Sequence, residues 1–512
     1  MFKLIYKSSV SACFELDNKV PYYSPDSYKV FLNGKQIGDE RKENIFSLFN
    51  LEPDTEYSVK ISLGGEELKF TTNSETAFVD VKELGAKADG VSDDTYYVQM
   101  AIDMCPKGGR VLLREGTYFV RPIVMKSGVT LELKKGATLL GDTVEEHYPF
   151  IKATLDEDKD GVNASWEGEP FDCHQSFISA YKQKDFAIVG EGTIDGNAQN
   201  STWWQQTKGR KVARPRLVFF NRCENVVLHG VTCQHSAAWN LHPFFSHNLG
   251  FYDVRVNNPK VSPNTDGLDP ESCDEVKIIG CVFSVGDDCV AIKSGKRYMG
   301  MKYKTPASNH TLRNNLFRDG HGAIVLGSEM SGGVKNLTVG QCIFENTDRG
   351  LRIKTRRGRG KYGIIDGVLF ENIKMHGVLT PLVINMYYFC DPDGHTEAVW
   401  SRDPKIPVDD GTPYLGKFTF RDIECTDVEY CAGYFDGLVE QPIKEITIEN
   451  VSFSYKNEAT AGRPAMLEFV RDYCKEGLYV DNVEKLVLKN VTFDGVVGDK
   501  IIKKNCGKII EN

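Results

Sequence analysis

The chain has 512 residues, with 62 lysines and arginines against 71 aspartates and glutamates, which gives a formal net charge of −9. Its 41% apolar and 26% charged residues are typical of a globular protein, and the sequence contains no apolar run of about 18 residues that could span a membrane. The acidic balance argues against nucleic-acid binding. We therefore expect neither a nucleic acid nor a membrane as a partner.

Location and redox state follow from simple sequence signals. Residues 1–7 give way to polar residues without the apolar region and cleavage site of a signal peptide, so we expect a cytoplasmic protein. The 14 cysteines are scattered without a CxxC pair, which predicts free thiols packed in apolar layers. The 47 glycines, about 9% against a usual ~7%, indicate many tight turns.

The first 75 residues predict a small domain. Short alternating segments at residues 28–32 and 57–61 are separated by turn residues, which is typical of an antiparallel sandwich. Residues 51–61 (LEPDTEYSVKI) resemble the tyrosine-corner region of fibronectin type III domains. We therefore expect a fibronectin type III-like β-sandwich over residues 1–75, with another small β module as the alternative.

The larger domain, residues 76–512, begins with its one clear helix. Residues 94–104 carry Val98, Ala101 and Ile102 at helical spacing, with Asp94 among the possible caps. Beyond the helix, short β-type phrases end in Gly or Asn and recur at intervals of roughly 20 to 40 residues. Examples are NVVLHGVTC, EVKIIGCVF, KNLTVGQCIF, EITIENVSF and KLVLKNVTF.

Such repeats, without intervening helices, predict a solenoid. Gly and Asn tolerate the left-handed backbone that is needed where each coil turns a corner. We therefore predict an all-β fold for this domain, a right-handed parallel β-helix of roughly ten coils. A propeller is the alternative, but blades built from hairpins do not match this phrasing.

Four short segments carry the chemistry. In a parallel β-helix, matching positions on successive coils lie about 4.8 Å apart. The intervals are 21 residues from Asp266 to Asp287, 33 from Asp288 to His321 and 31 from His321 to Arg352, and each is one plausible coil. The segments can therefore stack as carboxylate, carboxylate pair, imidazole and guanidinium, with tightly turning glycines at Gly267, Gly286, Gly320 and Gly322.

Three adjacent carboxylates cannot all titrate normally, because like charges raise at least one pKa. A protonated acid beside an ionised base is what glycoside hydrolysis requires. Arg352, Lys354 and the basic run at residues 356–361 add local positive charge, which suits an anionic sugar. Each segment alone is more often an ordinary turn or a solvated face, and their shared order is what favours a site.

This set resembles family 28 of the glycoside hydrolases, the polygalacturonases and their relatives. Residues 78–90 with 93–95, and residues 190–196 with Trp203 and Trp204, are similar to the lead-in phrases of pectin-degrading β-helices. The resemblance implies that Asp287 is the general acid, that Asp266 and Asp288 together activate water, and that His321 supports them. It also implies inversion, with room for water between the carboxyl groups, and neither a cofactor nor a metal.

The same resemblance implies a set of substrate-binding residues. Arg352 and Lys354 would bind the galacturonate carboxylate, and a tyrosine would close the site, either Tyr387 or Tyr388. Further candidates are Asn264, Lys293, Trp239 and His242. Gly286 and Lys293 depart from the pattern of secreted endo-acting members, and residues 239–243 and 320–333 look like bacterial exo-acting enzymes.

We therefore expect exo-hydrolysis of α-1,4 bonds in oligogalacturonides or pectic polysaccharides. The long segments 142–175 and 390–416 are candidates for the walls of a closed cleft. The alternatives are a rhamnogalacturonan hydrolase of the same family, a Ca²⁺-dependent pectate lyase, and a non-catalytic carbohydrate-binding β-helix. The sequence does not predict the oligomeric state.

Overall fold

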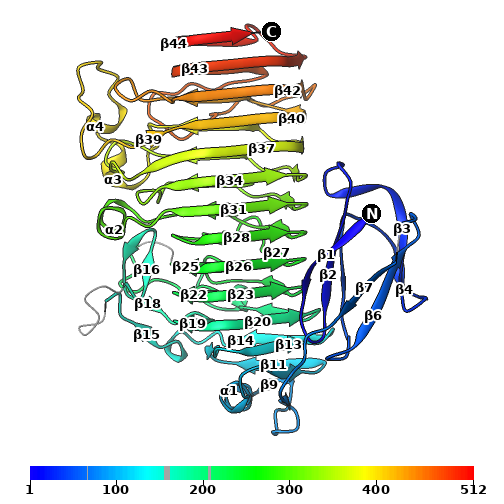
Figure 1. Cartoon of the computed structure of the whole chain (residues 1–512). Helices are drawn as coiled ribbons and strands as arrows, with labels where there is room; N and C mark the ends of the chain where they lie inside the picture. Colours follow the sequence, from blue (N-terminus) through cyan, green and yellow to red (C-terminus); the bar gives the residue numbers. More distant parts are fainter. Residues whose placement is uncertain (66, 155–161, 206–208, 512) are drawn as a thin grey trace.

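The computed structural model describes residues 1–65, 67–154, 162–205 and 209–511. Two small antiparallel sheets form the amino-terminal part (Figure 1). The first has the order β1 (Phe2–Lys7), β2 (Ala12–Leu16), β5 (Ile45–Leu48). The second has the order β4 (Lys35–Glu43), β3 (Tyr23–Leu32), β6 (Glu56–Ile61), β7 (Leu68–Thr71).

The two sheets enclose a core of aromatic and aliphatic side chains that includes Phe14, Tyr28 and Phe46. The Tyr57 hydroxyl accepts a hydrogen bond of 2.9 Å from the backbone N–H of Glu52, the back-bond that defines a tyrosine corner. The sandwich therefore has the local geometry expected of a fibronectin type III-like module. The domain limits, residues 1–75 and 76–512, stay a prediction.

The rest of the chain winds into coils whose strands stack in parallel ladders (Figure 1). The longest ladder contains fourteen strands. They are β8 (Phe78–Asp80), β10 (Gly109–Leu113), β13 (Val129–Leu133), β20 (Lys184–Gly190), β23 (Glu224–His229), β26 (His247–Tyr252), β28 (Asp274–Ile279), β31 (Ala307–Arg313), β34 (Val334–Gly340), β37 (Ile364–His376), β40 (Lys417–Val428), β42 (Glu445–Tyr455), β43 (Glu476–Asp494) and β44 (Ile501–Glu511).

A second ladder runs beside it and joins β37. Its strands are β9 (Asp89–Asp93), β11 (Gly116–Val120), β14 (Ala137–Gly141), β21 (Thr193–Asp195), β24 (Thr232–Gln234), β27 (Arg255–Asn257), β29 (Val282–Ser284), β32 (Leu316–Arg318) and β35 (Ile343–Glu345). The right-handed parallel β-helix is therefore confirmed, but the expected number of coils, roughly ten, is too low. The first coils lack the Gly/Asn phrase, so the repeat could not be counted there.

The third ladder carries the candidate site. Its strands are β12 (Ile123–Val124), β19 (Ile178–Tyr181), β22 (Val218–Asn221), β25 (Leu241–Phe244), β30 (Val290–Ile292), β33 (Ile324–Gly327), β36 (Arg349–Lys354), β38 (Thr380–Asn385) and β41 (Cys431–Asp436). Single bridges from Leu241 to Leu268 and from Leu268 to Val290 join β25 to β30.

Loops and short elements lie outside the ladders. They are the pairs β15 (Phe150–Ile151) with β18 (Cys173–His174) and β16 (Ser165–Trp166) with β17 (Glu169–Pro170), helices α1 (Thr95–Met104), α2 (Arg297–Tyr303), α3 (Asp391–Gly394) and α4 (Glu397–Trp400), and the 3-10 turns Glu145–His147 and Ala198–Asn200. The short strand β39 (Tyr414–Leu415) instead pairs in parallel with the start of β37. The expected helix exists as α1. It is not the only helix, and Asp94 does not cap it, because the Asp94 carboxylate accepts the N–H groups of Lys87 and Ala88 instead.

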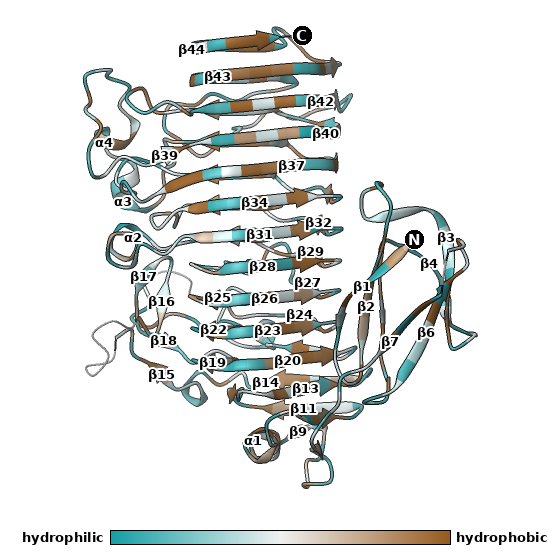
Figure 2. Ribbon diagram, in the orientation of Figure 1, coloured by the Kyte–Doolittle hydropathy of each residue, from teal (hydrophilic) through white to brown (hydrophobic). Residues whose placement is uncertain are grey.

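One continuous apolar core fills the coils. Hydrophilic and hydrophobic residues alternate along ladder strands such as β40 and β42, as expected when every second side chain points inward (Figure 2). All 14 cysteines are free and most are buried, which confirms the thiol prediction. No helix among the described residues is long and apolar enough to cross a membrane.

Asparagine takes many of the coil corners. Asn225, Asn248, Asn309 and Asn336 occupy matching corner positions, each with φ between 52° and 57°. The Asn248 amide donates to Asn225 Oδ1 over 2.7 Å, and Asn336 donates to Asn309 over 3.1 Å, so the side chains also link neighbouring coils. Both predicted residue types therefore turn the chain, since Gly230 and Gly280 also have positive φ, at 82° and 73°.

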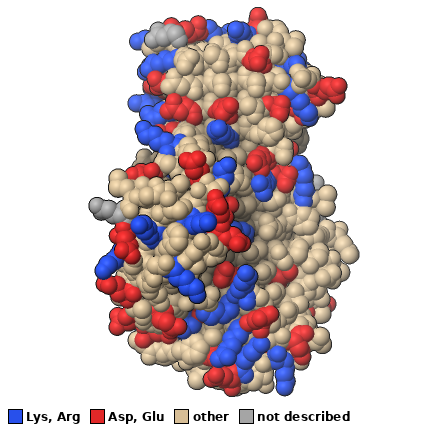
Figure 3. Space-filling model, turned by 90° about the vertical axis from the view of Figure 1, so that its right-hand side faces the viewer, with Lys and Arg blue, Asp and Glu red and all other residues tan. Residues whose placement is uncertain are grey.

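The sandwich packs directly on the β-helix. The His229 ring lies between the hydroxyls of Ser11 and Ser47, at 3.0 and 2.9 Å, and Tyr6 stacks on Tyr252. Burial lowers the pKa of His229 to about 3, so the ring is neutral. On this side of the molecule positive and negative side chains are interspersed (Figure 3). The interface also contains a charged pair, because Arg313 of β31 binds the Glu15 carboxylate of β2, with Nη2 2.9 Å from Oε2.

Candidate active site

The register of the third ladder places the acidic residues in two columns. Leu268 pairs with Val290, and Asp266 and Asp288 each lie two residues before this pair, so they occupy the same position on neighbouring coils. In the adjacent column His321 follows Asp287, and the His321 N–H donates to the Asp287 carbonyl over 3.0 Å. The coil steps are therefore 22 residues from Asp266 to Asp288 and 34 from Asp287 to His321.

The residue intervals used in the sequence analysis paired the wrong residues of successive coils. It matched Asp266 with Asp287 and His321 with Arg352, whereas Arg352 pairs with Val325. The residues still converge, because Arg352 and Lys354 point outward on the same strand, β36, and reach back across Gly322. The segments therefore meet as predicted, in a register shifted by one residue or more.

The glycines beside the site lie where a side chain would meet neighbouring atoms. Gly267, Gly286 and Gly320 lie at bends of the chain, as expected, but none of these three nor Gly322 has a φ in the left-handed region. A Cβ at Gly320 would lie 2.6 Å from Cys289 Sγ, and one at Gly322 would lie 3.4 Å from Asp288 Oδ1 and 3.5 Å from the Arg352 Cβ. Gly322 thus leaves the gap through which Arg352 meets Asp288.

The carboxylates of Asp266, Asp287 and Asp288 form one cluster. At least one oxygen of each lies within 4.8 Å of the others. This separation is shorter than the ~6.5–9.5 Å that usually leaves room for water in an inverting hydrolase. The expected gap is therefore absent between these oxygens, and the spacing alone does not predict inversion.

Asp288 is the ionised member of the cluster. Its oxygens lie 3.1 Å from Arg352 Nη1 and 2.7 Å from Lys354 Nζ. Burial alone would raise the pKa of Asp288, but Lys354 and Arg352 outweigh burial and hold the pKa well below its usual range. Asp288 is therefore held ionised, the state in which a carboxylate can accept a proton from an attacking water.

Asp287 and Asp266 are the members whose pKa is raised. Burial, followed by the charge of Asp288, raises the pKa of Asp287. Burial, followed by the charges of Asp269 and Asp287, raises the pKa of Asp266 well above its usual range. The cluster therefore combines a carboxylate that is held ionised with two carboxyl groups that keep their protons to higher pH, the asymmetry that acid–base catalysis needs.

His321 has a partner that the sequence analysis missed. Its Nδ1 lies 2.8 Å from Asp348 Oδ2, and this hydrogen bond raises the pKa of His321. Asp348 occupies the position of His321 one coil further on, since Ile324 pairs with Leu351. A search at the coil step of 27 residues between these strands would have found it. The positive charge of His321 opposes the rise in the Asp287 pKa.

A second charge network lies beneath the cluster. Lys293 is buried, and its Nζ lies 3.3 Å from Asp269, 3.3 Å from Glu329 and 4.0 Å from Asp266. Burial would raise the pKa of Glu329, but Lys293 and Lys354 outweigh burial and lower it to about 2. Asp269 and Glu329 were not predicted. Position in the chain is the one feature of the sequence that points to them: Asp269 follows the bridge residue Leu268, and Glu329 follows β33.

The predicted binding residues divide into two groups. Trp239, Asn264, Lys293, Lys354 and Tyr388 line a cavity of about 160 Å³ together with the three aspartates. Tyr388 also lies over Lys354, with Nζ 5.7 Å from the ring centroid. Of the two candidate tyrosines, the cavity thus contains Tyr388.

His242 and Tyr387 do not line this cavity. His242 is fully buried and its Nε2 lies 2.9 Å from Glu271, so it forms part of the support below the cavity floor. Tyr387 is also buried, with the Arg402 guanidinium 4.1 Å from its ring centroid. Both placements follow from side-chain direction, because neighbouring residues at a strand end point to opposite faces.

The two long insertions meet at one end of this cavity. Glu167 of the β16–β17 hairpin and Asp391 of α3 both line it, and Lys296 lies 4.0 Å from Glu167 and 3.1 Å from Asp391. The Lys296 N–H also donates to the Gly168 carbonyl over 2.8 Å. Segments 142–175 and 390–416 therefore do contribute walls, joined by Lys296.

The side chains of the basic run at residues 356–361 pair with acidic residues of nearby loops. Arg356 pairs with Asp393 over 2.6 Å and with Asp391 over 3.3 Å. Arg357 pairs with Glu440 over 2.5 Å, and Lys361 pairs with Asp410 over 3.0 Å. These pairs hold the cavity wall that contains Asp391, and a direct role of the run toward a sugar carboxylate stays a prediction.

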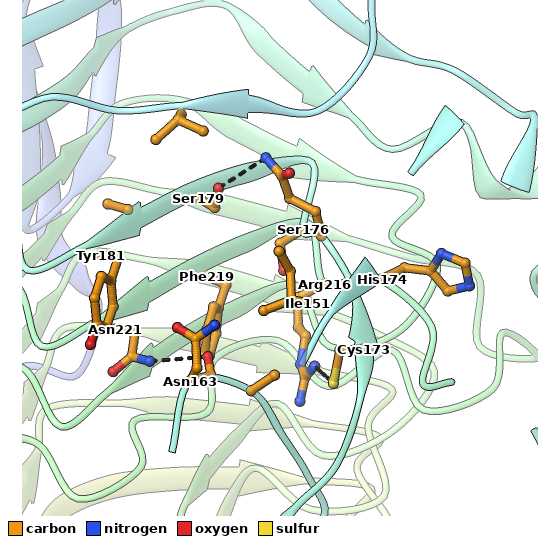
Figure 4. A pocket seen from close by; sticks show the side chains of 14 residues that line it. Ile151, Asn163, Cys173, His174, Ser176, Ser179, Tyr181, Arg216, Phe219 and Asn221 are labelled. Carbon is orange, nitrogen blue, oxygen red and sulfur yellow. Dashed lines mark hydrogen bonds between the residues drawn. The ribbon is translucent and has the colours of Figure 1, made fainter. Parts of the chain in front are cut away.

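A second cavity, of about 310 Å³, is lined by residues that include Cys173 and His174 of β18, Ser179 of β19 and Phe219 of β22 (Figure 4). Its floor includes Ser179 and Phe219, and Arg216 points toward Cys173 at its edge. Trp166 stacks on Trp239 at 5.4 Å between centroids, and the Arg216 guanidinium lies 5.3 Å from each ring. This aromatic and guanidinium barrier separates the second cavity from the acidic one.

The donor set does not favour a divalent cation. Ca²⁺ prefers six to eight oxygen ligands, and the three clustered carboxylates could supply some of them. However, Arg352 and Lys354 contact both oxygens of Asp288, and Lys293 lies near Asp266. The positive charge that a cation would bring is therefore already supplied by side chains. That no metal is needed stays a prediction.

Glu271 and Asp269 predict an unusual pH dependence of stability. Burial, followed by Glu329, raises the pKa of Glu271 to about 8, and burial raises that of Asp269 to about 7. Between pH 4.5 and 8 the folded state therefore holds protons that the unfolded state has lost, so stability falls as pH rises. We expect a lower melting temperature at pH 8 than at pH 5.

The matching variant is Glu271→Gln, which removes one titrating group and should flatten this slope. Glu275→Gln, on the exposed side of β28, is the control and should leave the slope as in the wild type. Melting temperatures recorded from pH 4 to 9 provide the measurement. An unchanged slope in Glu271→Gln would show that Glu271 is ionised in the folded protein.

Comparison with known proteins agrees with this geometry. Residues 151–465 match the family model described as Glycosyl hydrolases family 28, and residues 78–166 match that described as Rhamnogalacturonase A/epimerase, pectate lyase-like. A probable polygalacturonase of Vitis vinifera is 30% identical over 379 residues, which cover 72% of this chain and 73% of that protein. An endo-polygalacturonase of Pectobacterium carotovorum subsp. carotovorum is 32% identical, over 59% of this chain and 74% of that protein.

Two solved structures are similar over most of their length. The family 28 exopolygalacturonase of Yersinia enterocolitica has a TM-score of 0.75 at 20% identity, covering 99% of each chain, and at this identity it supports the fold alone. The hyperthermoactive exopolygalacturonase of Thermotoga maritima has a TM-score of 0.68 at 26% identity, covering 82% of this chain and 92% of that one.

Proposed function

Because the chain belongs to family 28 of the glycosyl hydrolases and is therefore a glycoside hydrolase, we propose that it removes galacturonate from the ends of α-1,4-linked galacturonan oligomers with inversion of configuration. The observation that carries this proposal is the cavity in which Asp266, Asp287 and Asp288 face Lys354, closed at one end by two insertions. The polygalacturonase relatives support the substrate class.

The proposed mechanism is a single displacement. Asp287, whose pKa is raised, donates its proton to the glycosidic oxygen and so releases the leaving sugar. A water molecule held by Asp266 and Asp288 attacks the anomeric carbon, and the ionised Asp288 takes its proton. After each turnover Asp288 releases the proton that it took from water, and Asp287 takes up a proton again. His321, held by Asp348, assists this return of a proton to Asp287.

Substrate charge is recognised by Arg352 and Lys354. A galacturonate carboxylate at the cavity mouth would share these cations with Asp288, which they already contact. Arg352 presents a planar guanidinium suited to two-point recognition of a carboxylate. The neutral apolar ring face of Trp239 and the Tyr388 ring complete the cavity around the sugar.

The closed end supports exo action. The β16–β17 hairpin forms one wall of the cavity that contains Asp266, with Trp166 stacked on Trp239 and Glu167 at that wall, and in this proposal it stops a polymer from continuing past Asp266. A small cavity of this kind favours a chain end over the middle of a chain. The endo-acting relative, at 32% identity, makes exo action the point that most needs a direct test.

We expect the protein to release saturated monogalacturonate from oligogalacturonides from the first turnover, in the presence of a chelator. Product sizes followed by chromatography, ultraviolet absorbance and proton NMR of the new anomer test this together. Inversion predicts a β-anomer first. Loss of activity with chelator and an absorbing unsaturated product would instead identify a lyase, and intermediate-sized early products would identify an endo enzyme.

The matched variant is Trp166→Ala, which removes the barrier between the two cavities and should shift early products from monomer toward dimer. Trp204→Ala is a control, because this partly buried indole packs elsewhere, donating to the Ser236 carbonyl over 2.9 Å. Rhamnogalacturonan is the second substrate to assay, since residues 78–166 match a rhamnogalacturonase-type model.

A further inference from the structure

Two aromatic side chains from separate insertions meet at the surface beyond the cavity. Phe469 is 82% exposed, an unusual position for a phenylalanine. Trp400, the last residue of α4, is half-buried beside it, with ring centroids 5.2 Å apart and ring planes at 88°. We call this pair, Trp400 and Phe469, the aromatic platform. Helix α4 projects from the side of the β-helix that bears the insertions (Figure 1).

The platform stands on a fixed loop. Phe469 has a φ of 60°, a conformation that is a genuine outlier for a bulky residue. Arg349 donates to the carbonyls of Pro464 over 2.6 Å and Arg463 over 2.5 Å, and Asn385 donates to the Met466 carbonyl over 2.9 Å. These side chains belong to the third ladder, so the loop is held by the same strands that carry the site.

A continuous set of contacts joins the platform to the substrate-binding cations. Arg352 Nη2 lies 2.9 Å from Met466 Sδ, and the carbonyl of Met466 also accepts the Phe389 N–H over 3.3 Å. Glu468 pairs with His395 over 2.5 Å, which ties the two insertions together beside the rings. Three residues of extended chain span at most about 10 Å, so Phe469 lies within a short distance of Arg352.

The chemistry of the platform fits a sugar ring. Rigid aromatic side chains give large contact area at little cost in conformational entropy, and sites for small ligands are typically lined by such rings with a few polar groups. Here the rings are flanked by the Glu468 and His395 pair and open to solvent. Glu167 of the β16–β17 hairpin forms one wall of the cavity, and Arg352, which contacts Met466, marks the side from which we expect a longer substrate to extend.

We propose that the aromatic platform is a distal subsite, which stacks a pyranose ring of the pectic chain on the leaving-group side of the cavity. This inference rests on the proposed function. Its consequence is a dependence on chain length: a hexagalacturonate reaches the platform and gains binding, whereas a digalacturonate ends at Arg352.

The test compares Phe469→Ala and Trp400→Ala with the wild type on digalacturonate and hexagalacturonate. We expect KM for hexagalacturonate to rise about fivefold or more relative to the change for digalacturonate, with kcat nearly constant, because distal binding is shared by ground state and transition state. Phe469→Tyr should restore the hexagalacturonate preference. Tyr96→Ala, which removes an exposed ring on α1, is the matched control.

Two failures are distinguishable. If the wild type hydrolyses neither galacturonan, the proposed function is wrong and the inference falls with it. If the wild type hydrolyses both and the variants keep its chain-length preference, or lose both substrates equally, the platform is not a subsite while the proposed function stands. Unchanged melting temperatures of the variants exclude a merely structural effect.

Discussion

Replacement of Asp287 by Asn should reduce kcat by two to four orders of magnitude, the usual contribution of a positioned general acid, while leaving the fold intact. An amide cannot donate the proton that the glycosidic oxygen needs, and Asp287 is the member of the cluster that combines a raised pKa with partial exposure to the cavity. Asn keeps the side-chain oxygen that accepts the Asp288 N–H over 3.0 Å, so local structure is preserved.

The matched control is Asp319→Asn. Asp319 lies two residues before His321, and its left-handed φ of 62° is one that asparagine adopts readily. Reducing-sugar release under saturating oligogalacturonide, together with the melting temperature, distinguishes loss of chemistry from loss of fold. Wild-type rates in Asp287→Asn would assign the acid to another carboxyl group, and Asp266 would be the first to examine because its pKa is also raised.

The β-helix could be predicted from the sequence because each of its repeats has recognisable local features. Phrases such as residues 225–233 and 275–283 each contain a buried strand and a corner residue that tolerates positive φ. The early coils before β20 lack these phrases, and the coil count was too low for that reason. The sandwich was visible through Tyr57, whose back-bond needs only a short stretch of chain.

The sequence predicted most of the residues that form the site, but not which residue of one coil lies over which residue of the next. Coil steps of 22, 34 and 27 residues are set by loop lengths between strands, and no local signal states this register. Asp348 and the choice between Tyr387 and Tyr388 depended on that register. The buried network of Lys293 was equally hidden, because the partners of a charge are decided by packing.

Gly322 shows how the local sequence and the packing of neighbouring coils are connected. Its sequence neighbours suggested a turn, yet its function in the structure is to leave space between Asp288 and Arg352. A Cβ there would touch Asp288 Oδ1 at 3.4 Å and the Arg352 Cβ at 3.5 Å, so its absence leaves room between these two residues. The low pKa of Asp288 depends first on Lys354 and then on Arg352.

The second large effect is expected from Lys293→Met, which should destabilise the protein by about 3–5 kcal/mol near neutral pH, the typical cost of leaving a buried charge without its partner. Lys293 is buried and faces Asp269 and Glu329 at 3.3 Å each. Methionine fills a similar volume without the charge, so the loss reports electrostatics more than packing. Activity should fall as well, and stability is therefore the decisive measurement.

The pH dependence of Lys293→Met separates this cause from a packing defect. Lys293 is the leading cause of the lowered pKa of Glu329, about 2 in the folded protein against 4.5 ordinarily, so this pairing stabilises above pH 4.5 and is lost as pH falls toward 2. The gap in melting temperature between wild type and variant should therefore narrow below pH 4.5.

In the double variant Lys293→Met/Glu329→Gln, which removes both charges, much of the lost stability should return, whereas exposed Lys335→Met should change little. A gap that is constant with pH and not reduced by Glu329→Gln would show that Lys293 acts through packing alone.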